Sequence, residues 1–130
     1  MPLERDAKGI LRSALPVRLT HKTSVEFPAL VDSGTSDIFL PVSLANTLGI
    51  ENEGKPIQVR QVSGDNGGFE AIIRSVEVLH NKEVFEVMRN QRIFVIDSDI
   101  QFCLFGREPL FKRFDITFSE KRKKITLTRV

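Results

Sequence analysis

The sequence predicts an all-β fold for this 130-residue chain. Short runs of alternating or β-branched apolar residues recur along it, separated by turn-forming residues. One stretch, residues 41–50, has the clear pattern of a helix. A chain of this length can bury a core of its own without disulfides or metals. We therefore expect a single domain over residues 15–130 with one or two short helices, and residues 1–14 as an N-terminal extension or edge strand.

The first half of the chain predicts a hairpin, a strand and the helix. Residues 16–20 and 24–31 are apolar and β-branched around a polar turn, as in two paired strands. Alternation resumes at residues 38–40, which predict another strand. Pro41 suits the first turn of the helix, and Gly49 suits its end.

The second half predicts further short strands. Residues 57–62 and 69–79 flank residues 63–68, which contain three glycines and an Asn-Gly pair and so predict a flexible hairpin tip. Residues 107–113 predict one or two helical turns. Other strands are expected at residues 84–87, 92–96, 102–105, 115–118 and 125–130.

Charge and composition argue against several classes of protein. The formal net charge is +2, and a basic excess gathers at residues 121–124, between two alternating segments, as in a solvated hairpin turn. Nucleic-acid binding is the alternative, but without Tyr or Trp for stacking and without a wider basic stripe we expect no nucleic acid. No apolar run is long enough to cross a bilayer, and the first residues lack the apolar core of a secretory signal. We expect a soluble protein.

The cysteine and the two histidines predict no metal or cofactor site. Cys103 lies in an apolar run, where a buried, inert thiol is expected, and a lone thiol favours a reducing, intracellular compartment. His21 and His80 are far apart, and neither has ligand spacing with Cys103 or with carboxylates. No motif of a serine or cysteine hydrolase accompanies them.

The most informative feature is residues 31–36, Val-Asp-Ser-Gly-Thr-Ser, which place Asp32 in a tight turn after an apolar strand. An isolated Asp-Ser-Gly is weak evidence, because such an aspartate often only bonds its own backbone. Far downstream, however, residues 102–107 read Phe-Cys-Leu-Phe-Gly-Arg, a second apolar strand that ends in glycine. The glycine-rich stretch lies between the two.

This order of features resembles the retropepsin-like aspartic proteases over about residues 15–130. In that family an apolar strand delivers Asp-Thr/Ser-Gly to the active site, a glycine-rich flap follows, and a second apolar strand ends in glycine before a helix. The resemblance implies a closed barrel of short strands with a flap hairpin. Because the chain has one copy of the motif, it also implies a homodimer that cleaves an extended polypeptide with one Asp32 from each subunit.

The resemblance assigns roles to individual residues. Asp32 is the catalytic carboxylate, and the motif is supported by Ser33, which locks the two motif loops across the dimer axis, and by Gly34 and Thr35. Substrate-binding and flap positions are Leu30, Phe39, Ser63, Gly64, Gly67, Gly68, Phe69, Phe102 and Leu104. Gly106 and Arg107 take structural roles. For any single apolar position, packing in the core is the competing role.

One departure from the viral pattern concerns the acid that viral members pair with the arginine after the later glycine. Ser36 stands at that place and the acid appears one residue on, as Asp37, so an Arg107–Asp37 pair is not expected. Arg107 would instead brace the loop through backbone carbonyls. An alternative function is a non-catalytic dimerisation or peptide-binding module with the same fold.

Overall fold

The computed structural model describes residues 2–4, 14–32, 34–50, 56–61, 64–97, 102–119, 121 and 124–130. The strands are β1 (Pro2–Glu4), β2 (Ala14–Thr20), β3 (Ser24–Val31), β4 (Ile38–Pro41), β5 (Pro56–Gln61), β6 (Gly64–His80), β7 (Glu83–Ile96), β8 (Cys103–Phe105), β9 (Phe114–Ser119) and β10 (Lys124–Arg129). The helical elements are α1 (Val42–Leu48) and the π-helical turn η1 (Arg107–Phe111). The chain is therefore predominantly β, as predicted.

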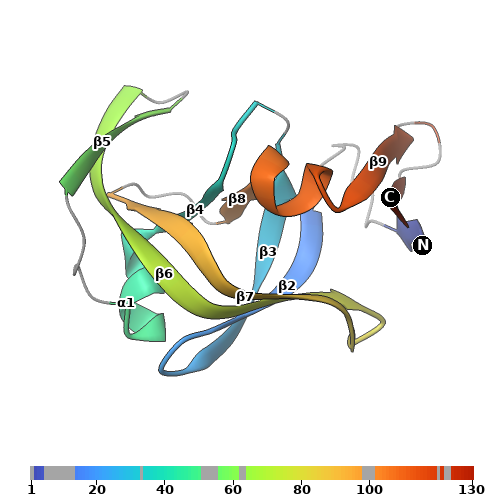
Figure 1. The fold of residues 1–130 in the computed structure, drawn as a ribbon, viewed down its shortest axis with the longest axis horizontal. Helices are drawn as coiled ribbons and strands as arrows, with labels where there is room; N and C mark the ends of the chain where they lie inside the picture. The colour runs from blue at the N-terminus through green and yellow to red at the C-terminus, as the bar shows by residue number, and fades with distance from the viewer. Residues whose placement is uncertain are drawn as a thin grey trace.

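Six strands close into a barrel. Neighbouring strands pair in the order β2-β3-β8-β4-β7-β6, and a further pairing of β2 with β6 completes the ring. Strand β5 extends β6 as a hairpin beyond the barrel. The remaining strands form a separate sheet in the order β1-β10-β9, which lies with both chain ends on the side of the molecule away from the β5–β6 hairpin (Figure 1).

Period-two alternation explains why these segments are strands. In β2, Leu15, Val17 and Leu19 are fully buried, while the residues between them are exposed or half-buried. The same alternation places one face of each barrel strand in a common core, which also receives Leu44 and Leu48 from α1. Burial of this one face fixes the register of the strands.

Helix α1 lies within the predicted residues 41–50 and is shorter than predicted at both ends. Pro41 is its N-cap, and Gly49 has φ 77° and donates its N–H to the last turn. The turn between β2 and β3 satisfies two further carbonyls at the helix end: the Lys22 N–H donates to Leu48 O at 3.0 Å and Thr23 Oγ1 to Thr47 O at 2.8 Å. The helix is thus tied to the hairpin that leads into Asp32.

The glycine stretch is not the hairpin tip that the sequence predicts. The β5–β6 ladder runs from Pro56 opposite Phe69 to Gln61 opposite Gly64. Residues 62–63, which include Ser63, lie outside the described residues. Gly64, Gly67 and Gly68 belong to strand β6. At Gly68 a Cβ atom would lie 2.1 Å from Val95 O, so the close approach of β7 explains a glycine inside a strand.

The strands expected at residues 84–87 and 92–96 are one strand, β7. The polar residues between them continue the ladder with β6, although Asn90 takes a left-handed conformation (φ 50°). A register shift between Val78 and Leu79 leaves Phe85 without a partner on β6. A long hairpin therefore replaces two short strands.

The unpartnered Phe85 joins the second sheet to the barrel. Its ring stacks on Phe114 with centroids 5.5 Å apart, and its carbonyl accepts a hydrogen bond of 2.8 Å from Arg129. Arg129 also donates to Glu86 at 2.9 Å and lies over both rings. Because Arg113 approaches the same carboxylate, Glu86 connects β7 with β10 and with the end of η1.

The two adjacent glycines of β6 offer a matched test of this packing. Gly68→Ala is expected to lower the free energy of unfolding by about 1–3 kcal/mol, because β7 must shift to make room. Gly67→Ala meets no atom within 4 Å, so its free energy of unfolding is expected to change by at most about 0.5 kcal/mol. Urea unfolding of both variants measures the difference, and equal midpoints would contradict the close approach.

Candidate active site

Asp32 stands at the point where β3 ends. Its N–H donates to Phe105 O at 2.9 Å, which continues the pairing of β3 with β8 by one residue. Its Oδ1 accepts the Gly34 N–H at 2.8 Å, and its carbonyl accepts the N–H and Oγ1–H of Thr35 at 3.3 and 3.2 Å. The Gly34 N–H thus holds one carboxylate oxygen, and Thr35 holds the backbone of Asp32. Ser33 lies outside the described residues.

The loop after Asp32 is held by the segment that follows β8. The N–H groups of Gly106, Arg107 and Glu108 donate to the carbonyls of Asp37, Thr35 and Ser36 at 3.0, 3.0 and 2.7 Å. Arg107 thus braces the loop through a backbone carbonyl, with its own N–H as the donor. The two motifs at residues 31–36 and 102–107 are brought together by these bonds.

Gly106 is required by the same contact. A Cβ atom there would lie 2.4 Å from Thr35 O and 2.5 Å from Thr35 Oγ1. Any side chain would push η1 away from the Asp32 loop, so glycine is the residue that permits the approach. The sequence predicted a structural role for Gly106 but did not identify Thr35 as the residue that it contacts.

Four apolar side chains form a row beside Asp32. Register pairs Leu30 with Leu104, Leu104 with Phe39, and Phe39 with Phe94, so their side chains share the face of the sheet opposite to the core. The rings of Phe39 and Phe94 stack with centroids 5.5 Å apart. We call Leu30, Leu104, Phe39 and Phe94 the apolar row; Phe102 lies two residues before Leu104 and is half-buried. Phe94 was missed, because only its pairing with β4 places it there.

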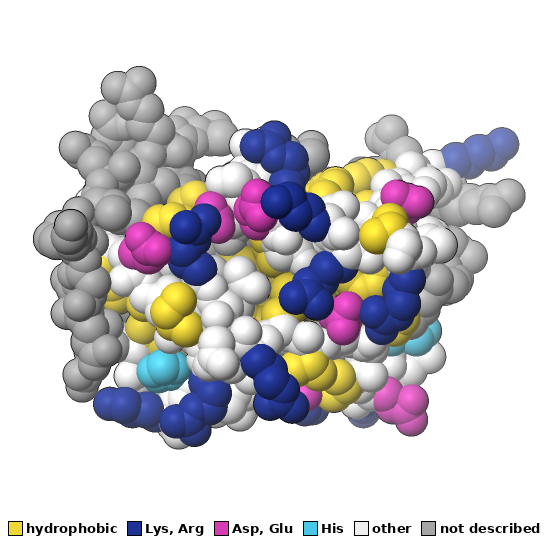
Figure 2. Space-filling view, in the orientation of Figure 1, with side chains coloured by type: hydrophobic (Ala, Val, Ile, Leu, Met, Phe, Trp, Pro, Cys, Tyr) yellow, Lys and Arg dark blue, Asp and Glu magenta, His cyan; other side chains and the backbone are white. Residues whose placement is uncertain are grey.

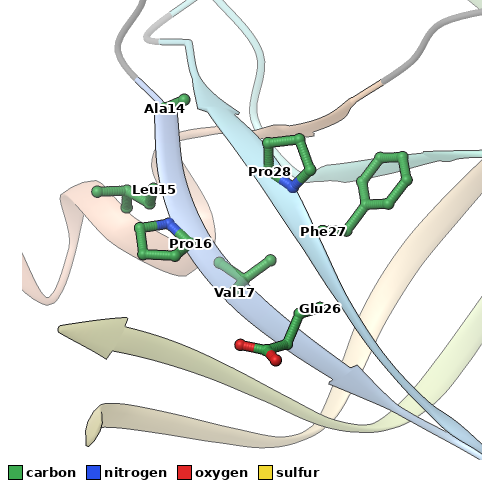
Figure 3. A pocket seen from close by; sticks show the side chains of 7 residues that line it. All are labelled: Ala14, Leu15, Pro16, Val17, Glu26, Phe27 and Pro28. Carbon is green, nitrogen blue, oxygen red and sulfur yellow. The ribbon is translucent and has the colours of Figure 1, made fainter. Parts of the chain in front are cut away.

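The apolar row continues onto β2. Ala14 is opposite Leu30, and the exposed Pro16 is opposite Pro28. Ala14, Pro16, Phe27 and Pro28 are among the residues that line a hollow of about 340 Å³ next to Leu30 in sequence and register, and Figure 3 shows the two proline rings on adjacent strands. The apolar surface beside Asp32 therefore extends across five strands.

Asp37 is a buried charged residue, and its partner is Arg92. The Asp37 residue is 6% exposed; its Oδ1 accepts a hydrogen bond of 2.9 Å from Arg92, and its Oδ2 one of 3.0 Å from Ser36 Oγ. The hydrogen bond to Asp37 and the charge of this carboxylate raise the pKa of Arg92. Asp37, the acid one residue after the viral position, is thus bound by Arg92 of β7. The sequence did not predict this partner.

A second hollow lies at the base of the β5–β6 hairpin. It measures about 390 Å³ and is lined in part by Val42, Phe69 and Asp97. The Asp97 N–H donates to Gly67 O at 2.9 Å, which fixes the strand that leads toward the hairpin turn. The hairpin therefore rises from an ordered base.

The described residues contain no group of three or more His, Cys, Asp and Glu side chains that could hold a metal ion. Within the same part of the chain, no helix has both the length and the apolar character needed to cross a membrane. On the face shown in Figure 2, Lys and Arg side chains lie between acidic and apolar ones and form no continuous basic stripe among the described residues.

Comparison with known proteins decides the family. The model of a family described as aspartyl protease matches residues 16–108, from β2 to the start of η1. The chain belongs to the aspartyl protease family. Among solved structures, this aspartyl protease domain is similar to a retropepsin-like aspartic protease from Rickettsia conorii, with a TM-score of 0.64 and 20% identity over 92% of this chain and 82% of that one. No curated protein sequence gives a significant match. The predicted retropepsin-like fold is confirmed.

Cys103 sits on β8 beside the site of this aspartyl protease domain but points into the core. Its Sγ–H donates to Pro28 O at 3.4 Å, and burial raises its pKa to about 12. A thiol reagent at pH 8 is therefore expected to leave the native protein unmodified and to modify it on unfolding in urea, because the thiolate is the reacting form. Rapid modification of the native protein would contradict this burial, and Cys103→Ala supplies the blank.

Proposed function

We propose that this chain is a homodimeric aspartic endopeptidase, in which Asp32 of each subunit supplies one carboxylate of a single site on the two-fold axis. The observation that carries the proposal is the way the Asp32 loop is held. An aspartate that only closed its own turn would not need a second strand and its glycine packed against the same loop. Membership of the aspartyl protease family gives this arrangement its chemical meaning.

The dimer follows from counting carboxylates. Aspartyl chemistry uses two carboxyl groups that share one proton, because two carboxylates about 3 Å apart do not both ionise readily. The chain has one copy of the motif, at residues 31–36. The second carboxyl group is therefore Asp32 of another copy, and Ser33 is the residue proposed to lock the two loops together.

The proposed reaction is hydrolysis without a covalent intermediate. The ionised Asp32 takes a proton from a bound water, whose oxygen attacks the peptide carbonyl, while the protonated Asp32 donates its proton to the carbonyl oxygen. The carbon–nitrogen bond of the resulting diol then breaks. The nitrogen receives a proton from one carboxyl group, and a hydroxyl proton of the diol returns to the other, so that an acid and an amine leave.

The surfaces beside Asp32 support an extended polypeptide as the substrate. The apolar row would receive hydrophobic side chains near the cut, with Phe102 beside Leu104 as a further contact. The β5–β6 hairpin, with Gly64, Gly67, Gly68 and Phe69 on β6, is proposed as the flap that closes over the peptide and hydrogen-bonds its backbone as an added strand.

Asp32→Asn is expected to lower the rate of peptide-library cleavage by about 10²–10⁴-fold, because the loop keeps its shape but loses a general acid and base. Asp115→Asn, the same change at an exposed position of β9, is expected to cleave like the wild type. A statine-type inhibitor should block the wild type. Equal cleavage by Asp32→Asn and the wild type across acidic to neutral pH would exclude the aspartyl mechanism.

Sedimentation tests whether the active protein is a dimer. Cleavage and dimerisation are expected to rise together as the protein concentration increases, because one chain carries half of the site. A protein that stays monomeric at concentrations where it cleaves could not assemble this site.

A further inference from the structure

We infer that Arg92 is a positioning residue for the reaction: through Asp37, it holds the loop that carries Asp32. The inference rests on the proposed function for its catalytic part, and on the geometry of the loop for the rest. Arg92 lies on β7, far from the motif in sequence, and its guanidinium contacts the last residue of the loop before β4.

The Asp37 end of this pair is buried and the Arg92 end is not. The side chain of Asp37 is 8% exposed, whereas that of Arg92 is 49% exposed. An exposed ion pair contributes little, but a buried carboxylate that loses its cation is left uncompensated. Arg92 is therefore the charge that allows an acid to sit at this buried position.

Arg92 is itself held in place from two other sides. Its guanidinium lies 5.4 Å from the centre of the Phe94 ring, which stacks on Phe39. Its Nε is 3.9 Å from a carboxylate oxygen of Glu70 on β6. The side chain is thus fixed on the same face of the sheet as the apolar row, beside the strand that carries Phe39.

A chain of contacts leads from Arg92 to the backbone of Asp32. Asp37 accepts from Ser36 Oγ, and the carbonyls of Asp37, Ser36 and Thr35 are held by the backbone of residues 106–108. Thr35 in turn donates twice to the carbonyl of Asp32. Among the side-chain contacts described for Asp37, the one with Arg92 alone comes from another strand of the barrel. Loss of this contact would let the C-terminal end of the loop shift, and this shift would change the orientation of Asp32.

The test is a double-mutant cycle with Arg92→Met, Asp37→Asn and the double variant, using steady-state cleavage of one peptide at a temperature where every variant is folded. Arg92→Met is expected to lower kcat by about 10- to 100-fold, as misplaced catalytic groups do, with KM little changed. The double variant should lose no more than Arg92→Met alone, because both changes act on one contact. Arg92→Lys should restore part of kcat.

The matched control is Arg18→Met. Arg18 makes a comparable ion pair of 3.1 Å with Glu77 between β2 and β6, away from the Asp32 loop. This variant is expected to keep the wild-type kcat even where its unfolding midpoint falls as far as that of Arg92→Met. Equal loss of kcat in both arginine variants would mean that Arg92 acts on general stability alone.

A second measurement does not need cleavage. Amide hydrogen exchange at Gly34 and Thr35, whose N–H groups bond Asp32, is expected to be faster in Arg92→Met than in the wild type and unchanged in Arg18→Met. If the wild type cleaves no peptide but exchange still becomes faster in Arg92→Met, the proposed function fails, whereas the role of Arg92 in holding the Asp32 loop is supported. Unchanged exchange in Arg92→Met would overturn the positioning role of Arg92. A raised KM with normal kcat would also overturn it, because it would mean that Arg92 contacts the substrate directly.

Discussion

The site depends on the close approach of two loops that are distant in the sequence. The turn after β8 comes so near the Asp32 loop that a Cβ atom on Gly106 would lie 2.4 Å from Thr35 O. At this distance three successive N–H groups, those of residues 106–108, reach carbonyls of the loop. The turn at the end of β3 is thereby held by a second segment of the chain, and the proposed pairing of two Asp32 carboxylates needs such preorganisation.

The barrel makes this approach possible because β8 is inserted between β3 and β4. It pairs in parallel with β3 and antiparallel with β4, so the strand before Asp32 and the strand after it are both fixed to β8. The same register sorts the side chains. Val31, Phe105 and Ile38 belong to the core cluster, whereas the apolar row lies on the opposite face of the same strands. The core and the apolar row thus lie on the two faces of one set of strands.

Much of the fold and of the site could be predicted from the sequence. The alternating apolar residues predicted most of the strands, and Pro41 and Gly49 predicted the helix between them. The Asp-Ser-Gly motif and Gly106 marked the two loops that meet in the structure. The rest depends on distance between chain segments. Gly68 was assigned to a turn because local sequence does not show that β7 passes within contact of it. The partner of Asp37 was missed for the same reason, since Arg92 is 55 residues away.

The proposed active site needs two copies of Asp32, one from each subunit. Wild-type protein is mixed with Asp32→Asn, subunits are allowed to exchange, and cleavage is measured against the mutant fraction at constant total protein. With equal amounts, random pairing should leave about one quarter of the wild-type activity, because a mixed dimer lacks one carboxylate. Activity that falls only in proportion to the wild-type fraction, to about one half, would mean that each chain carries a complete site and would exclude a site shared between two subunits.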